Sequence, residues 1–431
     1  MSNELRTLTH IHKGIASSHR PVTGTDSGSK RGLDVALTSM EYPTKDAFGR
    51  MRVSNGKVLY HITHVYDNNQ MLMDQLVVGG ASIAHDSDES AMIMSLGTAS
   101  GDRAVYQTYE YIPYTPGNSH TAMFTAVFGV GSSASSQRIG LFDDDNGVFF
   151  EQKNQQMGVV IRSKVTGSVV DNRIEQSDWS HDTMDGSGDA NNPSGILLDL
   201  TNTQIGHISY EWLGVGSVFF SIIVDGVIHL VHAENNANQR PTVYMQRGSL
   251  PVRYEVENTG ATTATSDFRA ICTMVMSEGD ATKKNILNSV TNGISTVALS
   301  TTLRPIISIR LKSAFNRALL ELISFQLQLT TNDDYELQLL MNPTLTGASF
   351  ADITGSIAQR DVSATAVSGG IIISAGYGNK STSPISVKSD ELIRRLASDI
   401  AGTTQDVFTI AGRVRTGTGS GLGSITFKEI F

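Results

Sequence analysis

The chain has 431 residues, with 33 Lys and Arg against 42 Asp and Glu, which gives a formal net charge of −9. This acidic balance argues against broad electrostatic binding to nucleic acid or to an anionic membrane, so we expect neither nucleic acid as a partner nor membrane insertion. Charged residues make up only 17% of the chain, and 40 residues are Gly. Such a composition is typical of short strands joined by many turns, and this length suggests two or three domains.

The sequence lacks the marks of several other protein classes. The longest apolar runs, such as 218–224, have the length of a strand and not the roughly 18 residues of a membrane helix. The first residues carry no basic stretch followed by an apolar core, so we expect no secretory signal peptide. Cys272 is the single cysteine, which excludes an intrachain disulfide framework and a zinc site built from several cysteines. We therefore expect folding in a reducing compartment.

Residues 1–45 mix Ser, Thr, Gly, His and basic residues without a period of 2 or 3.6, and they predict an extended N-terminal arm. Two interpretations stay open for this arm. It is either a disordered tail or a segment that becomes ordered against a neighbouring subunit. In the second case Arg20 is a candidate docking residue.

Residues 46–280 follow a β pattern, which predicts a jelly-roll or lectin-like antiparallel β-sandwich. The dipeptides Asn146-Gly147 and Asp225-Gly226 each stand between two apolar runs and predict hairpin turns. A long polar loop is expected over 171–194. The expected strands are 122–129, 138–142, 148–151, 157–163, 195–200, 205–212, 217–224 and 227–232.

The polar stretch 281–302 is short of aromatic residues and predicts a linker between domains. A second, smaller β-sandwich is expected over 303–431. Within it, 389–396 predicts one short helix, with Ser389 as its N-cap. The chain ends in an alternating stretch at 424–431, so we expect the C-terminus to form part of a sheet. The predicted fold is therefore all-β, with two sandwiches after an arm.

No motif for enzymatic catalysis stands out. The chain has no phosphate-binding loop, no dinucleotide-binding glycine fingerprint and no Gly-x-Ser-x-Gly turn. Glu255 and Glu257 lie two apart, so a strand would place both on one face, where they could serve as a sugar-cleaving acid pair. The favoured interpretation is two solvent-facing acids beside Arg253. We expect no catalytic residues, no enzymatic activity and no cofactor.

Metal binding is also not favoured. The loop 182–189 is rich in oxygen donors and Gly, but loops of this kind are more often only hydrated. His61 and His64 are three apart, as are His229 and His232, and on a strand that spacing puts the two rings on opposite faces. We therefore expect no metal site.

Aromatic residues offer candidate contact surfaces. Tyr109 and Tyr111 belong to a tyrosine-rich stretch, and such residues are common at subunit interfaces, although half-buried strand positions explain them equally well. Trp179 and Trp212 are the candidate glycan contacts. For Trp212 and its aromatic neighbours, a place in the sandwich core is the favoured interpretation.

The segment 46–54, DAFGRMRVS, resembles the opening of a family of tailed-bacteriophage virion structural proteins, whose members carry a similar segment after a short polar arm. The likeness continues in the same order through 114–119, 138–143, 210–216 and 253–258. It implies a non-enzymatic component of the particle and brings no catalytic residues with it. Within the first segment, the candidate docking residues are Phe48, Arg50 and Arg52.

This resemblance leads to the following expectations. The protein is a virion component, assembled in the host cytoplasm and associated with the tail, in the baseplate, the collar or a fibre. A capsid-decorating head protein is the first alternative, and a carbohydrate-binding module that recognises the host receptor is the second. A depolymerase that uses Glu255 and Glu257 ranks last. The expected partners are other copies of the chain, as a trimer or another symmetric homo-oligomer, and other virion proteins, with a host surface glycan as a further candidate.

Overall fold

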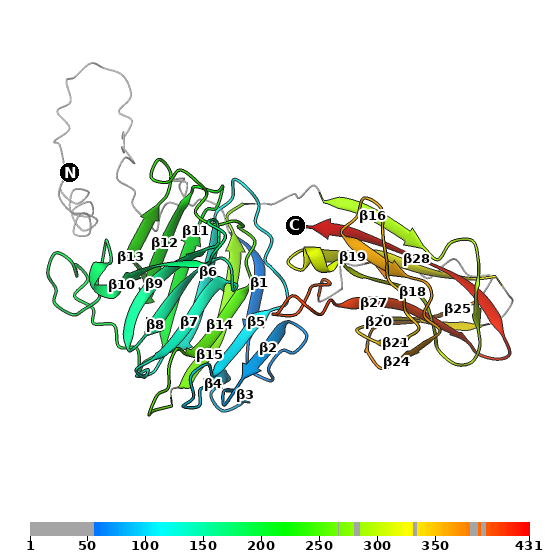
Figure 1. Cartoon of the computed structure of the whole chain (residues 1–431), viewed down its shortest axis with the longest axis horizontal. Helices are drawn as coiled ribbons and strands as arrows, with labels where there is room; N and C mark the ends of the chain where they lie inside the picture. The colour runs from blue at the N-terminus through cyan, green and yellow to red at the C-terminus, as the bar shows by residue number, and fades with distance from the viewer. Residues whose placement is uncertain (1–55, 266, 280–284, 331–333, 380–386, 389–393) are drawn as a thin grey trace, which may run out of the picture. The chain divides into compact units, whose positions relative to one another are not determined.

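The structure is a computed structural model and describes residues 56–265, 267–279, 285–330, 334–379, 387–388 and 394–431. Over these residues the regular elements are strands, apart from two single turns of 3-10 helix, η2 (Gln176–Asp178) and η3 (Ser313–Phe315). The strands pair antiparallel and enclose two large hydrophobic cores (Figure 1). The all-β prediction is therefore confirmed, and we call the two bodies the first and the second sandwich.

The first sandwich has two sheets in the described part of the chain. The eight-stranded sheet has the order β13 (Val227–Asn235), β12 (Ser217–Val224), β11 (Gln204–Tyr210), β6 (His120–Val127), β15 (Asp267–Ser277), β4 (Ala91–Ser95) and β3 (Ser82–Asp86), and β1 (Lys57–Thr63) pairs with β15. The seven-stranded sheet has the order β10 (Val170–Glu175), β9 (Gln156–Ser163), β8 (Gly147–Lys153), β7 (Ser135–Phe142), β14 (Val252–Asn258), β5 (Arg103–Thr108) and β2 (Met73–Val78).

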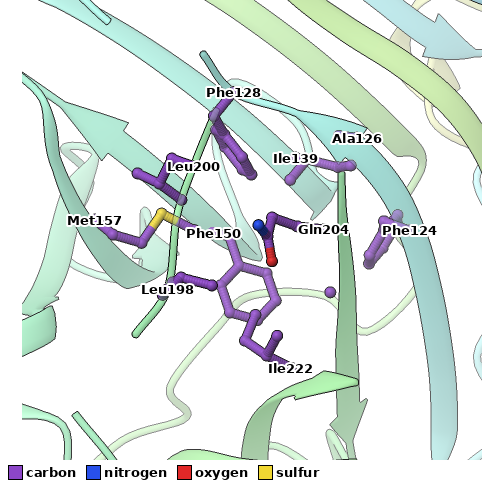
Figure 2. Close-up of a pocket in the computed structure, with 11 residues that line it drawn as sticks. Phe124, Ala126, Phe128, Ile139, Phe150, Met157, Leu198, Leu200, Gln204 and Ile222 are labelled. Atoms are coloured by element: carbon purple, nitrogen blue, oxygen red, sulfur yellow. The ribbon is translucent and has the colours of Figure 1, made fainter. Parts of the chain in front are cut away.

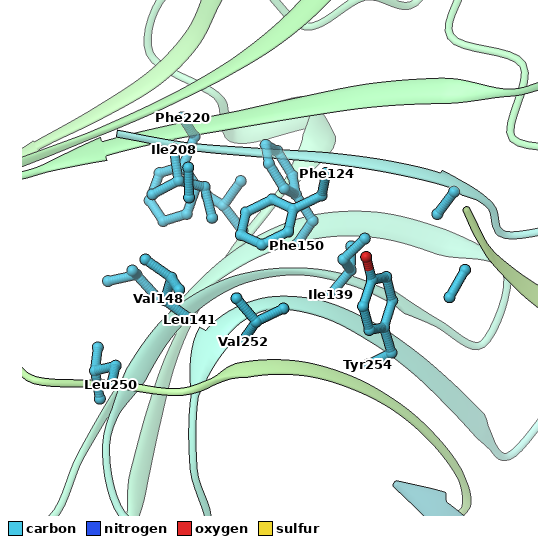
Figure 3. Packing of buried hydrophobic residues seen from close by; sticks show 14 of the residues in the cluster. Phe124, Ile139, Leu141, Val148, Phe150, Ile208, Phe220, Leu250, Val252 and Tyr254 are labelled. Carbon is cyan, nitrogen blue, oxygen red and sulfur yellow. The ribbon is translucent and has the colours of Figure 1, made fainter. Parts of the chain in front are cut away.

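Alternating side chains of the two sheets meet in the core of the first sandwich (Figure 3). Phe124, Ile208 and Phe220 come from the eight-stranded sheet, and Phe150 and Tyr254 are among those that come from the seven-stranded sheet. Because successive residues of a strand point to opposite faces, each of these strands presents its other residues on the outside. This alternation decides which residues of β14 are free to form a site.

The predicted strand over 195–200 is wrong. Its alternating residues Ile196, Leu198 and Leu200 are partly buried against the core, but the segment joins no sheet beyond a bridge from Leu197 to Asp185. Figure 2 shows Leu198 and Leu200 beside Phe150, around a void of about 10 Å³. A void of this size holds at most one water, so it is a gap in the packing and not a ligand site.

Both predicted hairpins are present. Asp225 and Gly226 join β12 to β13 with φ values of 52° and 76°, as a type I′ turn requires. Between β7 and β8 the turn is closed differently. The carboxylate of Asp143 accepts hydrogen bonds from the backbone N–H groups of Asp145 and Asn146, at 2.8 and 2.7 Å. The hairpin prediction was correct, but the acid at its start supplies the turn chemistry.

The second sandwich also has two main sheets over the described residues. The five-stranded sheet contains β16 (Ile286–Thr291), β28 (Gly419–Ile430), β19 (Leu319–Leu329) and β26 (Val387–Lys388), and β17 (Val297–Leu299) pairs with β28. The six-stranded sheet has the order β22 (Ala351–Asp352), β23 (Ala358–Asp361), β18 (Arg304–Leu311), β27 (Val407–Val414), β20 (Tyr335–Met341) and β25 (Ile371–Gly378). A separate pair is formed by β21 (Thr344–Thr346) and β24 (Ala366–Ser368).

Several predicted boundaries change. The linker predicted over 281–302 is wrong at 286–291 and 297–299, where β16 and β17 pair with β28, and its residues 281–284 lie outside the described residues. The polar loop predicted over 171–194 begins with most of β10, an edge strand with mainly polar residues. Of the predicted helix, 389–393 lies outside the described residues, and Leu396 forms a bridge to Leu320 instead of a helical turn. The predicted C-terminal strand is confirmed as the end of β28.

Candidate functional site

The two acids Glu255 and Glu257 lie on the outer face of the seven-stranded sheet, on the interior strand β14 between β7 and β5. The intervening Val256 points into the core, so the alternation predicted from the sequence is confirmed. Both carboxylates accept a hydrogen bond from the same atom, Nη1 of Arg138 on the neighbouring strand β7, at 2.5 and 2.9 Å. The pair is thus held together by a shared cation.

Glu255 is not solvent-facing, in contrast to the favoured sequence interpretation. Its side chain is 1% exposed and accepts further hydrogen bonds from Arg253 at 3.0 Å and from Arg103 at 2.9 Å. Long arginine side chains from β14 itself and from the flanking strands β7 and β5 close over it. A sequence pattern identifies the face of a strand, but it does not show which neighbouring side chains cover that face.

Charges alternate across the sheet in a row perpendicular to the strands. Glu255, Arg138 and Glu151 lie directly opposite one another on β14, β7 and β8, and the next position, on β9, is Gly158. A Cβ atom at Gly158 would lie 2.7 Å from Cζ of Arg173, so the missing side chain gives this arginine its path to Glu151. Arg173 donates to Glu151 at 2.8 Å, and Arg138 donates to the other oxygen of Glu151 at 2.8 Å.

Asp144 extends these contacts, because it accepts from Arg253 at 2.6 Å and from Arg103 at 2.7 Å. Beneath the arginines lies a small apolar cluster of Phe142, Phe149 and Val160. Cζ of Arg253 is 5.4 Å from the ring centroid of Phe142. The guanidinium groups therefore contact both carboxylates and aromatic faces. We call this set the ion-pair layer: Arg103, Arg138, Arg173, Arg253, Asp144, Glu151, Glu255 and Glu257.

The ion-pair layer is unsuited to acid catalysis. Burial alone would raise the pKa of Glu255, but Arg138, Arg253 and Arg103 outweigh it and hold the pKa of this carboxyl well below its usual value. A general acid of a glycosidase needs the opposite, a raised pKa that keeps its proton near neutral pH. As a permanently ionised group with both oxygens engaged, Glu255 can fix strands in register but is not poised to give or take a proton.

Acid should weaken the first sandwich through this carboxylate. Because the pKa of Glu255 is lowered on folding, its contribution to the free energy of unfolding is full above the unfolded pKa, about 4.3, and is lost as the pH falls below it. We expect urea midpoints to fall steeply between pH 5 and pH 3. Tryptophan fluorescence reports this directly, since Trp179 and Trp212 are the two tryptophans of the chain and both lie in the first sandwich. A Glu255→Gln variant should show a shallower fall, and an equal slope would contradict the assignment.

A second cluster surrounds Trp212, where Tyr114, His120, Tyr210 and Trp212 form what we call the aromatic corner. The ring of Tyr114 stacks on Tyr210 at 6.1 Å and meets Trp212 edge-on at 6.1 Å. The backbone N–H of Trp212 donates to the Tyr114 hydroxyl at 3.1 Å, and its indole N–H donates to the carbonyl of Met245 at 2.9 Å. Trp212 remains half-buried, with part of its ring facing a hollow of about 480 Å³.

The predicted contact residues are placed in different surroundings. Trp179 is 4% exposed and lies in the core, so little of its ring is left for a sugar. Tyr109 packs against a small cluster around Leu319, and the guanidinium of Arg394 lies 3.4 Å from its ring centroid. Tyr111 is buried and donates to Asp143 at 3.1 Å. Arg20, Phe48, Arg50 and Arg52, with the whole arm 1–45, lie outside the described residues.

The acidic loop after η2 uses its carboxylates on its own backbone. Asp182 accepts from the N–H groups of Met184 and Ser194, at 3.0 and 3.2 Å. Hydrogen bonds from Ser187 lower the pKa of Asp185 to about 2, so this acid is ionised as a turn cap. Over the residues that the structure describes, no group of three or more His, Cys, Asp or Glu is arranged to hold a metal ion.

Sequence reasoning missed Arg138, Arg103 and Glu151. Arg138 and Glu151 belong to predicted strands, whereas Arg103 lies in β5, which was not among them. Pairing across the sheet brings together residues up to 152 positions apart. The sequence does show Arg253 and Glu255 two apart on one predicted face. Turning that signal into contacts requires the strand order, in which β14 lies between β7 and β5.

Comparisons with known proteins agree with the fold. No protein-family model matches the sequence, and no curated protein matches it either. Among solved structures, the Emp46p carbohydrate recognition domain is similar over 53% of this chain and 99% of its own, with 9% identity and a TM-score of 0.31. A glycosyl hydrolase family 16 protein from Mycobacterium smegmatis is similar over 51% of this chain and 100% of its own, with 10% identity and a TM-score of 0.35. A legume lectin-like domain from Entamoeba histolytica is similar over 52% of this chain and 98% of its own, with 6% identity and a TM-score of 0.31.

These similarities are distant and concern the fold alone. The two antiparallel sheets of the first sandwich are given by its own strand pairing. Sharing a fold with carbohydrate recognition domains and with glycosyl hydrolases assigns neither activity to this chain. No helix among the described residues has both the length and the apolar character that crossing a membrane requires.

Proposed function

We propose that this chain is a non-enzymatic structural component of a tailed-bacteriophage virion, associated with the tail in the baseplate, the collar or a fibre. One observation carries the proposal. The segments that resemble the virion family lie far apart in sequence, and within the described residues they form two groups of direct contacts. Segments 138–143 and 253–258 are paired strands joined by the ion-pair layer, and segments 114–119 and 210–216 form the aromatic corner.

The resemblance therefore concerns residues that build the first sandwich. In the ion-pair layer the two acids that a hydrolase would need are ion-paired, and in the aromatic corner the rings are hydrogen-bonded to backbone groups. Both groups hold distant strands in register. A family that shares such residues shares a rigid scaffold, and this favours a protein that works through its surfaces over one that works through a catalytic centre.

In the proposed role, copies of the chain assemble in the host cytoplasm into a symmetric homo-oligomer and join other virion proteins. Antibodies raised against the recombinant protein should detect a fixed number of copies in gradient-purified particles. Immunogold labelling should mark the tail. Labelling confined to the head would favour the capsid-decorating alternative, and particles free of the chain would overturn the proposal.

Carbohydrate recognition is the second candidate, and the hollow beside Trp212 favours it. Aromatic rings and polar side chains share its lining, as in many saccharide sites: Tyr114, Trp212, Arg247, Phe315 and Phe431. Phe315 is 42% exposed, so Phe315→Ala should leave the fold intact. Binding to host glycans on an array should fall with Phe315→Ala and stay unchanged with Ile294→Ala, a control at a 98% exposed site. Silence of the wild-type protein across host glycans would count against this candidate.

A further inference from the structure

The second sandwich contains a hollow of about 670 Å³ that no sequence motif indicated. Most of its lining residues lie on or next to β27, β20 and β25, which are neighbours in the six-stranded sheet. Figure 1 shows where these strands lie in the second sandwich. Its volume falls in the range of small-ligand sites, about 300–1,000 Å³. Every residue that lines it belongs to the second sandwich, and none of them also lines the hollow beside Trp212.

Three side chains of the hollow form a row across the three strands. Arg413 on β27 and Tyr377 on β25 lie directly opposite Glu336 on β20, one on each side. Nε of Arg413 donates to Glu336 at 2.6 Å, and Gln338 donates to the other carboxylate oxygen at 2.6 Å. Glu336 is therefore fixed in position, while Arg413 stays 46% exposed. Together, these contacts prepare an acceptor and a donor side by side at the surface.

Tyr377 is the unusual member of this row, because its side chain is 80% exposed. In the neighbouring row on the same face, Ala411 and Ala375 lie on either side of Gln338. An exposed tyrosine gives a rigid ring with an apolar face and a polar tip at a small cost in side-chain entropy. At this exposure, the ring is available to stack on a flat ligand.

A second charged pair, Asp334 and Arg415, lies two residues further along, on the same face of the sheet. The backbone N–H of Arg415 donates to the carbonyl of Asp334 at 2.9 Å, and their side chains form an ion pair at 3.5 Å. Two cations and two anions thus line the hollow, and their charges cancel. An anionic or a cationic ligand would meet an opposite charge that is already paired and a like charge beside it. The lining instead offers alternating donors and acceptors to a ligand without charge.

We propose that this hollow binds a neutral saccharide, with one sugar ring stacked on Tyr377 and its hydroxyl groups hydrogen-bonded to Glu336 and Arg413. A sugar has an apolar face of C–H groups and a rim of hydroxyls that both donate and accept, which matches a ring beside a paired carboxylate and guanidinium. The proposal rests on residues of the second sandwich and is independent of the virion role.

The test is isothermal titration of the full-length protein with maltohexaose, cellohexaose, N-acetylchitohexaose and yeast mannan, up to millimolar concentrations. At least one of these neutral saccharides should bind. Tyr377→Ala should weaken its affinity at least tenfold, and Tyr377→Phe, which keeps the ring, should stay within about threefold of wild type. Arg413→Gln should also weaken binding, because the amide cannot reproduce the guanidinium donors.

Matched controls distinguish this site from other exposed aromatic residues of the protein. Tyr66 is 93% exposed in the first sandwich, and Tyr66→Ala should leave the affinity unchanged. Phe315→Ala, in the hollow beside Trp212, should leave it unchanged as well. The proposal is overturned if no neutral saccharide binds, if Tyr377→Ala binds as tightly as wild type, or if only a sulfated saccharide such as heparin binds.

Discussion

Replacing Glu255 with glutamine is expected to lower the free energy of unfolding of the first sandwich by about 3–5 kcal/mol. Glutamine has nearly the same volume, so the change removes a charge and leaves the packing in place. Three guanidinium groups, those of Arg103, Arg138 and Arg253, lose the anion that they share. The side chain of Arg253 is fully buried and cannot regain its hydration. Urea unfolding followed by tryptophan fluorescence measures the change.

Glu257 provides the matched control for this experiment. It accepts from the same atom of Arg138, but its side chain is 32% exposed and solvent screens the interaction. Glu257→Gln should therefore lower the free energy of unfolding by no more than about 1 kcal/mol. Equal effects of the two substitutions would mean that the burial of a carboxylate in the ion-pair layer does not determine how much it contributes to the free energy of unfolding.

The contrast between these neighbouring acids shows how far the sequence can predict the site. Alternation along β14 places Glu255 and Glu257 on one face, and this was predicted. The difference between them, 1% against 32% exposed, comes from the arginines of other strands. The partner Arg138 is 117 residues away from Glu255, and its position depends on a strand order that no local pattern encodes.

The fold itself was largely predictable where local patterns and turn chemistry coincide. Asp225 and Gly226 adopt the positive φ values of a hairpin turn, and apolar residues alternate along both strands that they join. Predictions failed where a segment is buried without pairing in a sheet, or pairs in a sheet while its residues stay polar. The stretch 195–200 alternates because its apolar residues close over the core, without a ladder of hydrogen bonds. Conversely, β10 forms a ladder with β9 but is polar because it lies at the edge.

The candidate saccharide site on the second sandwich shows the same limit. Glu336, Tyr377 and Arg413 all lie within 303–431, where a second β-sandwich was predicted. Their alignment in one row requires the register of three strands that are not consecutive in the sequence. An exposed tyrosine is also indistinguishable from a core tyrosine by residue type, so only the structure separates Tyr377 from Tyr335, which is 2% exposed.

Deletion of residues 424–431 is expected to unfold the second sandwich and leave the first one folded. This segment of β28 pairs with all of β16 and with part of β19. It also buries Ile425, Phe427 and Ile430, at 0%, 0% and 3% exposure, which together contribute about 5–9 kcal/mol of hydrophobic stabilisation. That loss matches the whole stability of a typical domain, about 5–15 kcal/mol. Hydrogen exchange should show lost protection in β18, β19 and β27.

The control is the removal of Phe431 alone, whose side chain is 61% exposed and lies beyond the last paired residue. This variant should keep the protection of β19 close to that of the full chain. In the longer deletion, the urea transition seen by tryptophan fluorescence should persist, because both tryptophans lie in the first sandwich and its core is built from residues before 276. Simultaneous loss of that transition would show that the two cores depend on each other. Retained protection in β19 would show that the sheet does not need its central strand.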